Sequence, residues 1–223
     1  CYTKEKMLNY ICRQDSYFIT EGKDLLNQEF SSKHSTYFSI LQIIASGKTK
    51  RSEIDSALQK DVGTFLQNLE TKYELIRRKK PLLAKQNSKV STYELRDNFL
   101  RFWFRFIYPF QSLIERQLFS PPRGNISNHY EDYSGRVLEQ YFHDKVMESG
   151  QYTQVGNWWD RKGQNEIDLI AINEFDHTGI IAEVKRNPKK INLQKLAEKA
   201  ATLPSKDFAP YHLQPHPLSL SDM

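Results

Sequence analysis

Residues 165–187 read NEIDLIAINEFDHTGIIAEVKRN, two apolar stretches on either side of a polar loop. The segments 166–173 and 179–186 are typical of strands. Because side chains alternate along a strand, Glu183 and Lys185 are expected on one face. Asp168 lies in the middle of the first strand, so pairing of the two strands would bring it close to Glu183. A carboxylate in an apolar strand is costly unless it is compensated, and two beside a lysine predict a cation site.

The pattern of an acid two residues before a lysine is common by itself. The chain also contains it at Glu21–Lys23, Glu70–Lys72 and Asp160–Lys162. Glu21–Lys23 is in polar sequence around a glycine, and Asp160–Lys162 is at a turn. Glu70–Lys72 is on a predicted helix, where side chains two positions apart point in different directions. The alternative interpretation for Glu183 and Lys185 is an ordinary surface ion pair on an edge strand.

The chemistry of a phosphodiester-cleaving site matches these residue types. Mg²⁺ (or Mn²⁺) prefers a few carboxylate oxygens together with water and phosphate, and Asp168 and Glu183 are the predicted metal ligands. Lys185 would orient a metal-bound water or help to deprotonate it, and would counter the developing charge. Glu139, on the helix expected before the strands, would support a second ion or a metal-bound water.

The elements around this stretch predict an α/β sandwich with a small mixed sheet. A helix, a strand, the two strands above, a helix and a late strand are expected in that order, at residues 129–147, 152–161, 166–173, 179–186, 191–201 and 209–217. The preceding segment 120–129, with two prolines and a glycine, is expected to be a linker.

The preceding part of the chain is expected to be a winged helix-turn-helix. Helical periodicity at 37–46, 48–59 and 62–73 is followed by strands at 74–81 and 90–96, with Ser52 as the expected cap of the second helix. In a winged helix the third helix reads DNA and the hairpin forms the wing. The cations of the wing are then the predicted nucleic-acid contacts: Arg77, Arg78, Lys79 and Lys80. The alternative is a packing module whose charged edge is merely solvated.

An aromatic segment follows the hairpin. Phe99, Phe102, Trp103, Phe106, Ile107 and Phe110 recur at helical spacing. Such a stripe is typically core, and we expect it to be buried between the two domains. The predicted domain boundaries are therefore 1–36, 37–97, 98–128 and 129–223.

Bulk composition narrows the class of protein. The formal net charge is +5 with a pI near 9.0, which is compatible with nucleic acid but also with solvated lysines. The two cysteines, Cys1 and Cys12, give no disulfide framework, which favours a reducing cytoplasm. No stretch of 18 apolar residues predicts a membrane span. Gly47-Lys48-Thr49 is not a P-loop, because Gln42 occupies the position of the required glycine. Since the chain begins with Cys, we expect a fragment of a longer protein.

The stretches WWDRKGQNEIDLIA and IIAEVKR, with Glu139 in GRVLEQYF, resemble the PD-(D/E)xK nuclease superfamily, which includes archaeal Holliday-junction resolvases. More closely, YELRDNFLRFWFRFIYP followed by this module resembles the C-terminal half of archaeal-type (AAA, P-loop) ATPases. That resemblance covers roughly residues 35–223, and LSLSDM at the C-terminus is similar to an ending common in that family. One departure is Ile167, where the superfamily often has proline.

The resemblance implies roles for the residues already named. Asp168 and Glu183 correspond to metal ligands, Lys185 to the catalytic lysine and Glu139 to the helix acid. It also implies an ATP-binding domain before Cys1, with residues 1–36 as its trailing helices, and DNA, duplex or branched, as partner. Junction-cleaving relatives act as dimers, so a homodimer is also implied. The competing hypothesis is a non-catalytic DNA-binding or regulatory module on a nuclease-like scaffold.

Overall fold

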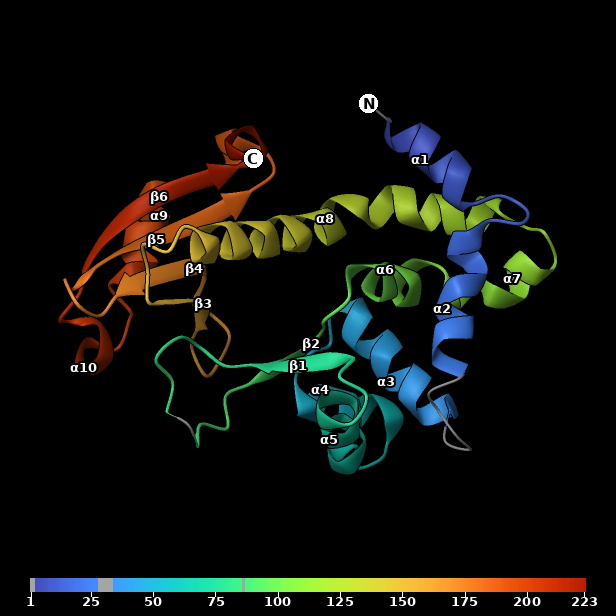
Figure 1. Ribbon diagram of the computed structural model, residues 1–223, viewed down its shortest axis with the longest axis horizontal. Coiled ribbons are helices and arrows are strands. Elements are labelled where there is room, and N and C mark those ends of the chain that lie inside the picture. The colour runs from blue at the N-terminus through green and yellow to red at the C-terminus, as the bar shows by residue number, and fades with distance from the viewer. Residues whose placement is uncertain (1–2, 28–33, 86) are drawn as a thin grey trace. The chain divides into compact units, whose positions relative to one another are not determined.

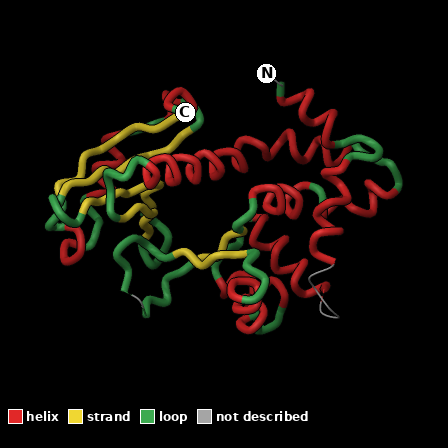
Figure 2. The backbone as a smooth tube through the Cα atoms, in the orientation of Figure 1, coloured by secondary structure: helices red, strands yellow, loops and turns green. Residues whose placement is uncertain are grey.

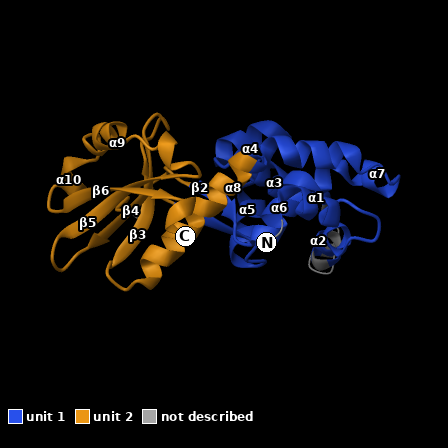
Figure 3. Ribbon diagram, turned by 90° about the horizontal axis from the view of Figure 1, so that it is seen from above, with its two compact units in different colours: residues 1–79, 92–130 blue, residues 80–91, 131–223 orange. Residues whose placement is uncertain are grey.

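The computed structural model describes residues 3–27, 34–85 and 87–223. The chain forms two compact units, coloured separately in Figure 3. Unit 1 comprises residues 1–79 and 92–130, and unit 2 comprises residues 80–91 and 131–223. Helices and two small sheets occur together (Figure 2), which agrees with the predicted α/β (α+β) class at that level.

Unit 1 is mainly helical. Its elements are α1 (Lys4–Ile11), α2 (Tyr17–Asn27), α3 (His34–Ser46), α4 (Arg51–Leu58), α5 (Gly63–Thr71), β1 (Ile76–Lys79), β2 (Thr92–Leu95), α6 (Asn98–Phe106), η1 (Tyr108–Phe110), α7 (Gln111–Glu115) and the first turns of α8 (Figure 1). Strands β1 and β2 pair antiparallel. The three helices and two strands predicted for residues 37–97 are thus present in the expected order. Of the predicted segment 1–36, residues 1–2 and 28–33 lie outside the described residues.

The start of α4 differs from the prediction that Ser52 is its cap. The helix begins at Arg51, so Ser52 is already inside its first turn. The backbone N–H of Lys50, the capping residue, donates instead to the Glu53 carboxylate at 2.9 Å. This bond fixes the helix start without a serine or threonine cap.

The aromatic segment is buried within unit 1, which corrects the expectation that it lies between two domains. Trp103, Phe104 and Phe106 of α6 are completely inaccessible to solvent. The Trp103 indole N–H donates to the Ile19 carbonyl of α2 at 2.9 Å, and Phe38 of α3 packs edge-on against Trp103. The helical stripe therefore serves as the core that joins α6 to α2 and α3.

The predicted linker at residues 120–129 is wrong, because α8 runs without interruption from Ser120 to Glu148. Pro121 and Pro122 are in the first turn of this helix, where backbone N–H groups have no partner inside the helix and proline is tolerated. Gly124 follows within the same helix, where a Cβ would meet no atom within 4 Å. The boundary between the units, at residues 130 and 131, falls inside α8.

Unit 2 is built on a mixed sheet in the order β3-β4-β5-β6. Its elements after α8 are β3 (Gln154–Trp159), β4 (Glu166–Asn173), β5 (Thr178–Lys185), η2 (Pro188–Lys190), α9 (Leu193–Ala200), α10 (Ser205–Phe208), β6 (His212–Ser219) and η3 (Leu220–Asp222). β3, β4 and β5 pair antiparallel, whereas β6 pairs parallel to β5. The predicted order of elements and the predicted mixed sheet are confirmed.

The sheet of unit 2 has an apolar layer on each face. On one face, Leu138 and Phe142 of α8 pack against small and branched residues of β4 and β5. On the other face, Leu196 of α9 and Phe208 of α10 pack against the isoleucines of the same two strands. The two clusters fix β4 and β5 from both sides, and these strands carry the predicted site.

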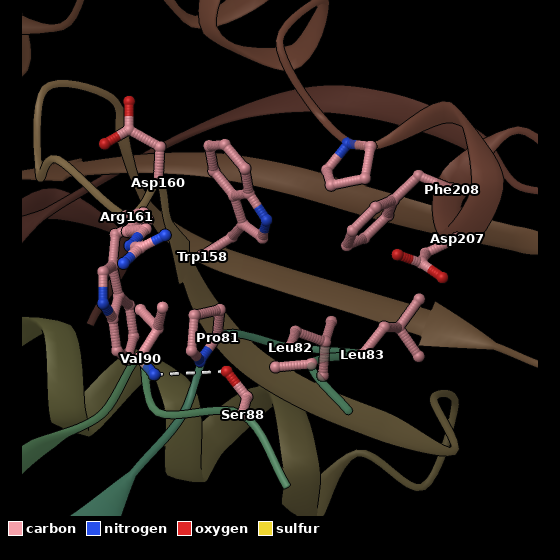
Figure 4. Close-up of a pocket in the computed structure, with 13 residues that line it drawn as sticks. Pro81, Leu82, Leu83, Ser88, Val90, Trp158, Asp160, Arg161, Asp207 and Phe208 are labelled. Carbon is pink, nitrogen blue, oxygen red and sulfur yellow. Dashed lines mark hydrogen bonds between the residues drawn. The ribbon is translucent and has the colours of Figure 1, made fainter. Parts of the chain in front are cut away.

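Residues 80–91 belong to unit 2, although the prediction placed them in the winged-helix domain. Leu82 and Leu83 pack against the cluster around Trp158, as Figure 4 shows. The Leu82 N–H donates to the Asn157 carbonyl of β3 at 2.8 Å. The apolar start of this segment is the physical reason, since it gains more from burial against the sheet than from exposure in a turn. Gln86 of this segment lies outside the described residues.

A helix that spans a membrane needs about 20 mostly apolar residues. None of the helices in the described residues is both long enough and apolar enough for this.

Candidate functional site

A β-bulge marks the position of Asp168. Gly156 pairs with Ile170 and Trp158 pairs with Ile167, so β3 contributes one residue, Asn157, opposite two residues of β4. A bulge leaves a backbone group without its ladder partner and turns the strand locally. Here the free group is the Asp168 carbonyl, which accepts hydrogen bonds from side chains instead.

Two donors meet at the Asp168 carbonyl. The Asn157 side-chain amide donates to it at 2.7 Å, and Nε2 of His143 on α8 lies 2.9 Å away. Because a carbonyl oxygen only accepts, Nε2 of His143 must carry its proton in this arrangement. The backbone of Asp168 is thus fixed from β3 and from α8 at once.

The predicted pairing of the two strands is confirmed, and it ends at the site. The ladder between β4 and β5 ends at Leu169 opposite Ala182. One further step in the same register places Asp168 opposite Glu183. There the Asp168 carboxylate accepts the Val184 N–H at 2.9 Å. The side chain therefore takes the place of a backbone partner where the two strands stop pairing.

Lys185 brings the two carboxylates together. Its ammonium lies 2.9 Å from Oδ2 of Asp168 and 3.7 Å from Oε1 of Glu183. The carboxylate side chains are only 12% and 13% exposed, against 35% for Lys185, so this is a mostly desolvated cluster that opens on the lysine side. The three residues predicted from the sequence do meet.

The electrostatics of the cluster fix the charge of Lys185. Burial by itself would lower the pKa of Lys185, but the hydrogen bond and charge of Asp168, followed by the charge of Glu183, raise it above its ordinary value. Lys185 is consequently protonated at neutral pH. Its ammonium is then a cation and a hydrogen-bond donor to Asp168.

Glu139 is the fourth predicted residue, and it lies half-buried on α8. Its charge also raises the pKa of Lys185, although it contributes least of the three acids. Glu139 is therefore near enough to Lys185 for their charges to interact. His143 is four residues further along α8, on the same helix face.

The donor set fits a divalent cation in part. Oδ1 of Asp168 accepts no hydrogen bond from the described residues, whereas Oε2 of Glu183 accepts the Asn192 N–H at 2.7 Å. Within residues 3–27, 34–85 and 87–223, no group of three or more His, Cys, Asp or Glu side chains is arranged to hold a metal ion. Two carboxylates remain as ligands, and Mg²⁺ commonly completes so small a set with water and phosphate.

The four predicted nucleic-acid contacts differ in their ion pairs and in their exposure to solvent. Arg77 and Lys79 both form ion pairs with Glu94 on the neighbouring strand, the second at 3.4 Å. Arg78, on the opposite face of β1, is exposed. Lys80 belongs to unit 2. Among the four, Arg77 and Lys79 are paired with an acid and Arg78 is exposed.

A separate hollow of about 320 Å³ lies in unit 2 (Figure 4). Its walls are mostly apolar, and they come from residues 80–91, the end of β3 and α10. Asp160, Arg161 and Asp207 are the charged residues among those that line it. The lining does not include Asp168, Glu183 or Lys185, so the hollow is distinct from the carboxylate cluster.

Sequence reasoning missed three residues that shape the site: His143, Asn157 and Asn192. The spacing of four between Glu139 and His143 on one helix was a usable signal. Asn157 and Asn192 gave none, because their roles depend on the bulge and on the return of the chain after β5.

Comparison with known proteins gives a family match and one curated relative. Residues 103–197 match the DUF234 family, described as "Archaea bacterial proteins of unknown function". This range includes all four candidate site residues. The chain is also 33% identical over 218 residues to "Uncharacterized protein MJECL04" of Methanocaldococcus jannaschii, an alignment that covers 91% of this chain and 48% of that protein. The chain thus spans about half the length of that relative. No solved structure matches it.

Proposed function

We propose that this chain binds DNA and that unit 2 hydrolyses phosphodiester bonds with Mg²⁺ or Mn²⁺, as an endonuclease of the PD-(D/E)xK type. The observation that supports the proposal best is the convergence of Asp168 and Glu183, from adjacent strands, on the single ammonium of Lys185. An acidic pair beside a protonated lysine provides metal ligands and a positive charge for a phosphoryl group.

Asp168 and Glu183 are the residues that would hold the ion. When bound, a divalent cation polarises the phosphodiester and lowers the pKa of a bound water. Lys185, kept protonated by the two acids, donates to phosphoryl oxygens and balances their growing negative charge. Glu139, on α8, would orient the attacking water. His143 and Asn157 hold the Asp168 backbone and so keep its carboxylate directed at β5.

The DNA-binding part of the proposal rests on α3, α4, α5 and the β1–β2 hairpin. Three helices followed by an antiparallel hairpin are the elements of a winged helix, in which α5 would enter the major groove. Of the four predicted wing cations, Arg78 is the exposed one, and it would contact phosphates. As the sequence resemblance implies, we further propose that an ATP-binding domain drives this module in a longer protein and that the module acts as a homodimer.

The competing proposal is a non-catalytic DNA-binding or regulatory module. Two observations favour it. Lys185 already pairs with both carboxylates, so part of their negative charge is compensated without a metal. In addition, the described residues contain no group of three or more ligating side chains suited to a metal.

The deciding experiment measures cleavage of labelled duplex, branched and single-stranded DNA with Mg²⁺ or Mn²⁺. Wild type is compared with Asp168→Ala and Lys185→Ala. Lys162→Ala is the matched control, because Lys162 belongs to another acid-x-lysine triplet of unit 2 and is exposed.

Cleavage that requires the metal, disappears in the two site variants and persists in the control supports the nuclease. If the folded wild type binds DNA but never cuts it under these conditions, the non-catalytic module is the better description of this chain.

A further inference from the structure

A strongly cationic segment of the chain, residues 185–200, begins at the carboxylate cluster. Between residues 185 and 200 the sequence has six cationic residues and one acid, Glu198, a net charge of +5. A second cationic segment, residues 77–89, has six cationic residues and no acid. The six cations of residues 185–200 are Lys185, Arg186, Lys189, Lys190, Lys195 and Lys199.

This segment is physically tied to the site. It begins at the end of β5, passes through η2 and forms α9. At its middle the Asn192 N–H donates to Oε2 of Glu183 at 2.7 Å. The Asn192 side chain also caps α9 by accepting the Lys195 N–H at 2.9 Å. The turn that carries Lys189 and Lys190 is therefore held against a carboxylate of the proposed metal site.

Three of these cations form no ion pair within the described residues. Lys189, Lys190 and Lys195 are exposed, and among the described residues no carboxylate lies within ion-pair distance of them. Arg186 differs, because its guanidinium donates to the Ser134 hydroxyl on α8. Arg77 and Lys79 of the hairpin also differ, because both pair with Glu94. Lys189 and Lys190 are neighbours in the sequence, and because like charges that lie close together repel one another, a bound anion would relieve their repulsion.

We propose that Lys189, Lys190 and Lys195 form the surface of unit 2 that binds the phosphate backbone of a nucleic acid and brings it to Asp168 and Glu183. The inference rests on the proposed function and assigns substrate binding to a place outside the winged helix. Two carboxylates repel an incoming phosphodiester, and an adjacent cationic surface compensates for that repulsion. Lysines of this kind position the strand without reading its sequence.

The test is the salt dependence of duplex DNA binding, measured by fluorescence anisotropy in EDTA so that no metal and no cleavage are involved. The triple variant Lys189→Gln, Lys190→Gln, Lys195→Gln is compared with wild type. Each phosphate that the protein no longer neutralises reduces the slope of log affinity against log salt by about 0.9, so the slope of the variant should fall by about 2–3. At 0.1 M salt, binding should weaken by roughly eightfold for each phosphate left without its lysine.

The matched control removes the same charge elsewhere, through Lys6→Gln, Lys162→Gln and Lys206→Gln, which replace exposed lysines. Its slope should stay within about one of the wild-type slope. Equal slopes for wild type and the triple variant would overturn the proposal, as would a wild type that does not bind duplex DNA. The proposal would also be overturned if the wild type bound phosphatidylserine vesicles but not DNA, and if the triple variant no longer bound those vesicles. The nuclease proposal fails separately, if DNA is bound through these lysines and never cut.

Discussion

Replacement of Gly179 by alanine should weaken the sheet that carries the candidate site. Gly179 is opposite Ile172 of β4 and next to Leu213 of β6. A Cβ at this position would lie 2.5 Å from the Ala171 carbonyl oxygen and 2.8 Å from a Leu213 methyl carbon, where ordinary contact begins near 3.4 Å. The carbonyl is backbone held by the ladder, so it cannot move aside as a flexible side chain would.

The cost of such overpacking is about 1–3 kcal/mol. Since about 1.4 kcal/mol corresponds to a factor of ten, the opening equilibrium of the sheet should increase by roughly 5- to 150-fold. Native-state hydrogen exchange, followed on peptides from β4 and β5, reports this local stability directly. Exchange on these peptides reports on unit 2 alone, whereas a global unfolding curve reports on both units together.

Gly135→Ala is the matched control in the same unit. Gly135 lies inside α8, and a Cβ there would meet nothing within 4 Å. Alanine in a helix interior is better than glycine by about 0.5–1 kcal/mol, so this variant should be slightly stabilised. Unchanged or increased protection of β4 and β5 in Gly179→Ala would refute the close approach described here.

Three further outcomes are expected. Burial would raise the pKa of Glu94, but Lys79 and then Arg77 hold it below its ordinary value. Its stabilising contribution is therefore present above the unfolded pKa, near 4.3, and is lost as the pH falls through the lower folded value, so Glu94→Gln should flatten the acid limb of a pH–unfolding curve. Trp103→Phe removes the indole N–H that donates to the Ile19 carbonyl and should cost about 0.5–1.5 kcal/mol, measured as faster hydrogen exchange in α2 and α6. Mg²⁺ at a hundred times its dissociation constant should stabilise the wild type by about 2.7 kcal/mol, an effect that EDTA reverses and Asp168→Ala abolishes in thermal unfolding.

The sequence predicted the strands of the site well because their signal is local. Eight residues of β4 alternate or cluster apolar side chains between turn residues, and the structure begins and ends that strand as expected. The convergence of Asp168, Glu183 and Lys185 followed from side-chain alternation once the two strands pair. The alternation of side chains along a strand was therefore enough to predict that these three residues meet.

The errors arose where distant residues decide the local structure. Two prolines and a glycine indicated a linker, yet proline in the first helical turn is compatible with α8. The polar composition of residues 80–91 hid the burial of Leu82 against β3. The protonation of Lys185 depends on the distances to its acids, which a sequence does not contain.

The bulge shows the same limit. It places Asn157 opposite two residues of β4, and the sequence of neither strand contains a feature that predicts it. The pairing of Arg77 with Glu94 was likewise not predicted, because it arises from the register of the hairpin.

Unit 2 is assembled from two separate pieces of chain, and this limits how the protein can be divided. A fragment cut at residue 131 would retain the sheet and the candidate site but lose residues 80–91, which supply Leu82 and Leu83 to the core and the Leu82 hydrogen bond to β3. Such a fragment would expose the apolar surface that these leucines cover and would be prone to aggregate. During synthesis, residues 80–91 are made before residues 131–223. Unit 2 can therefore be completed only after the second segment has been made. Insertions in the loop between β1 and β2, or its shortening, should therefore impair the sheet domain, although residues 131–223 are unchanged.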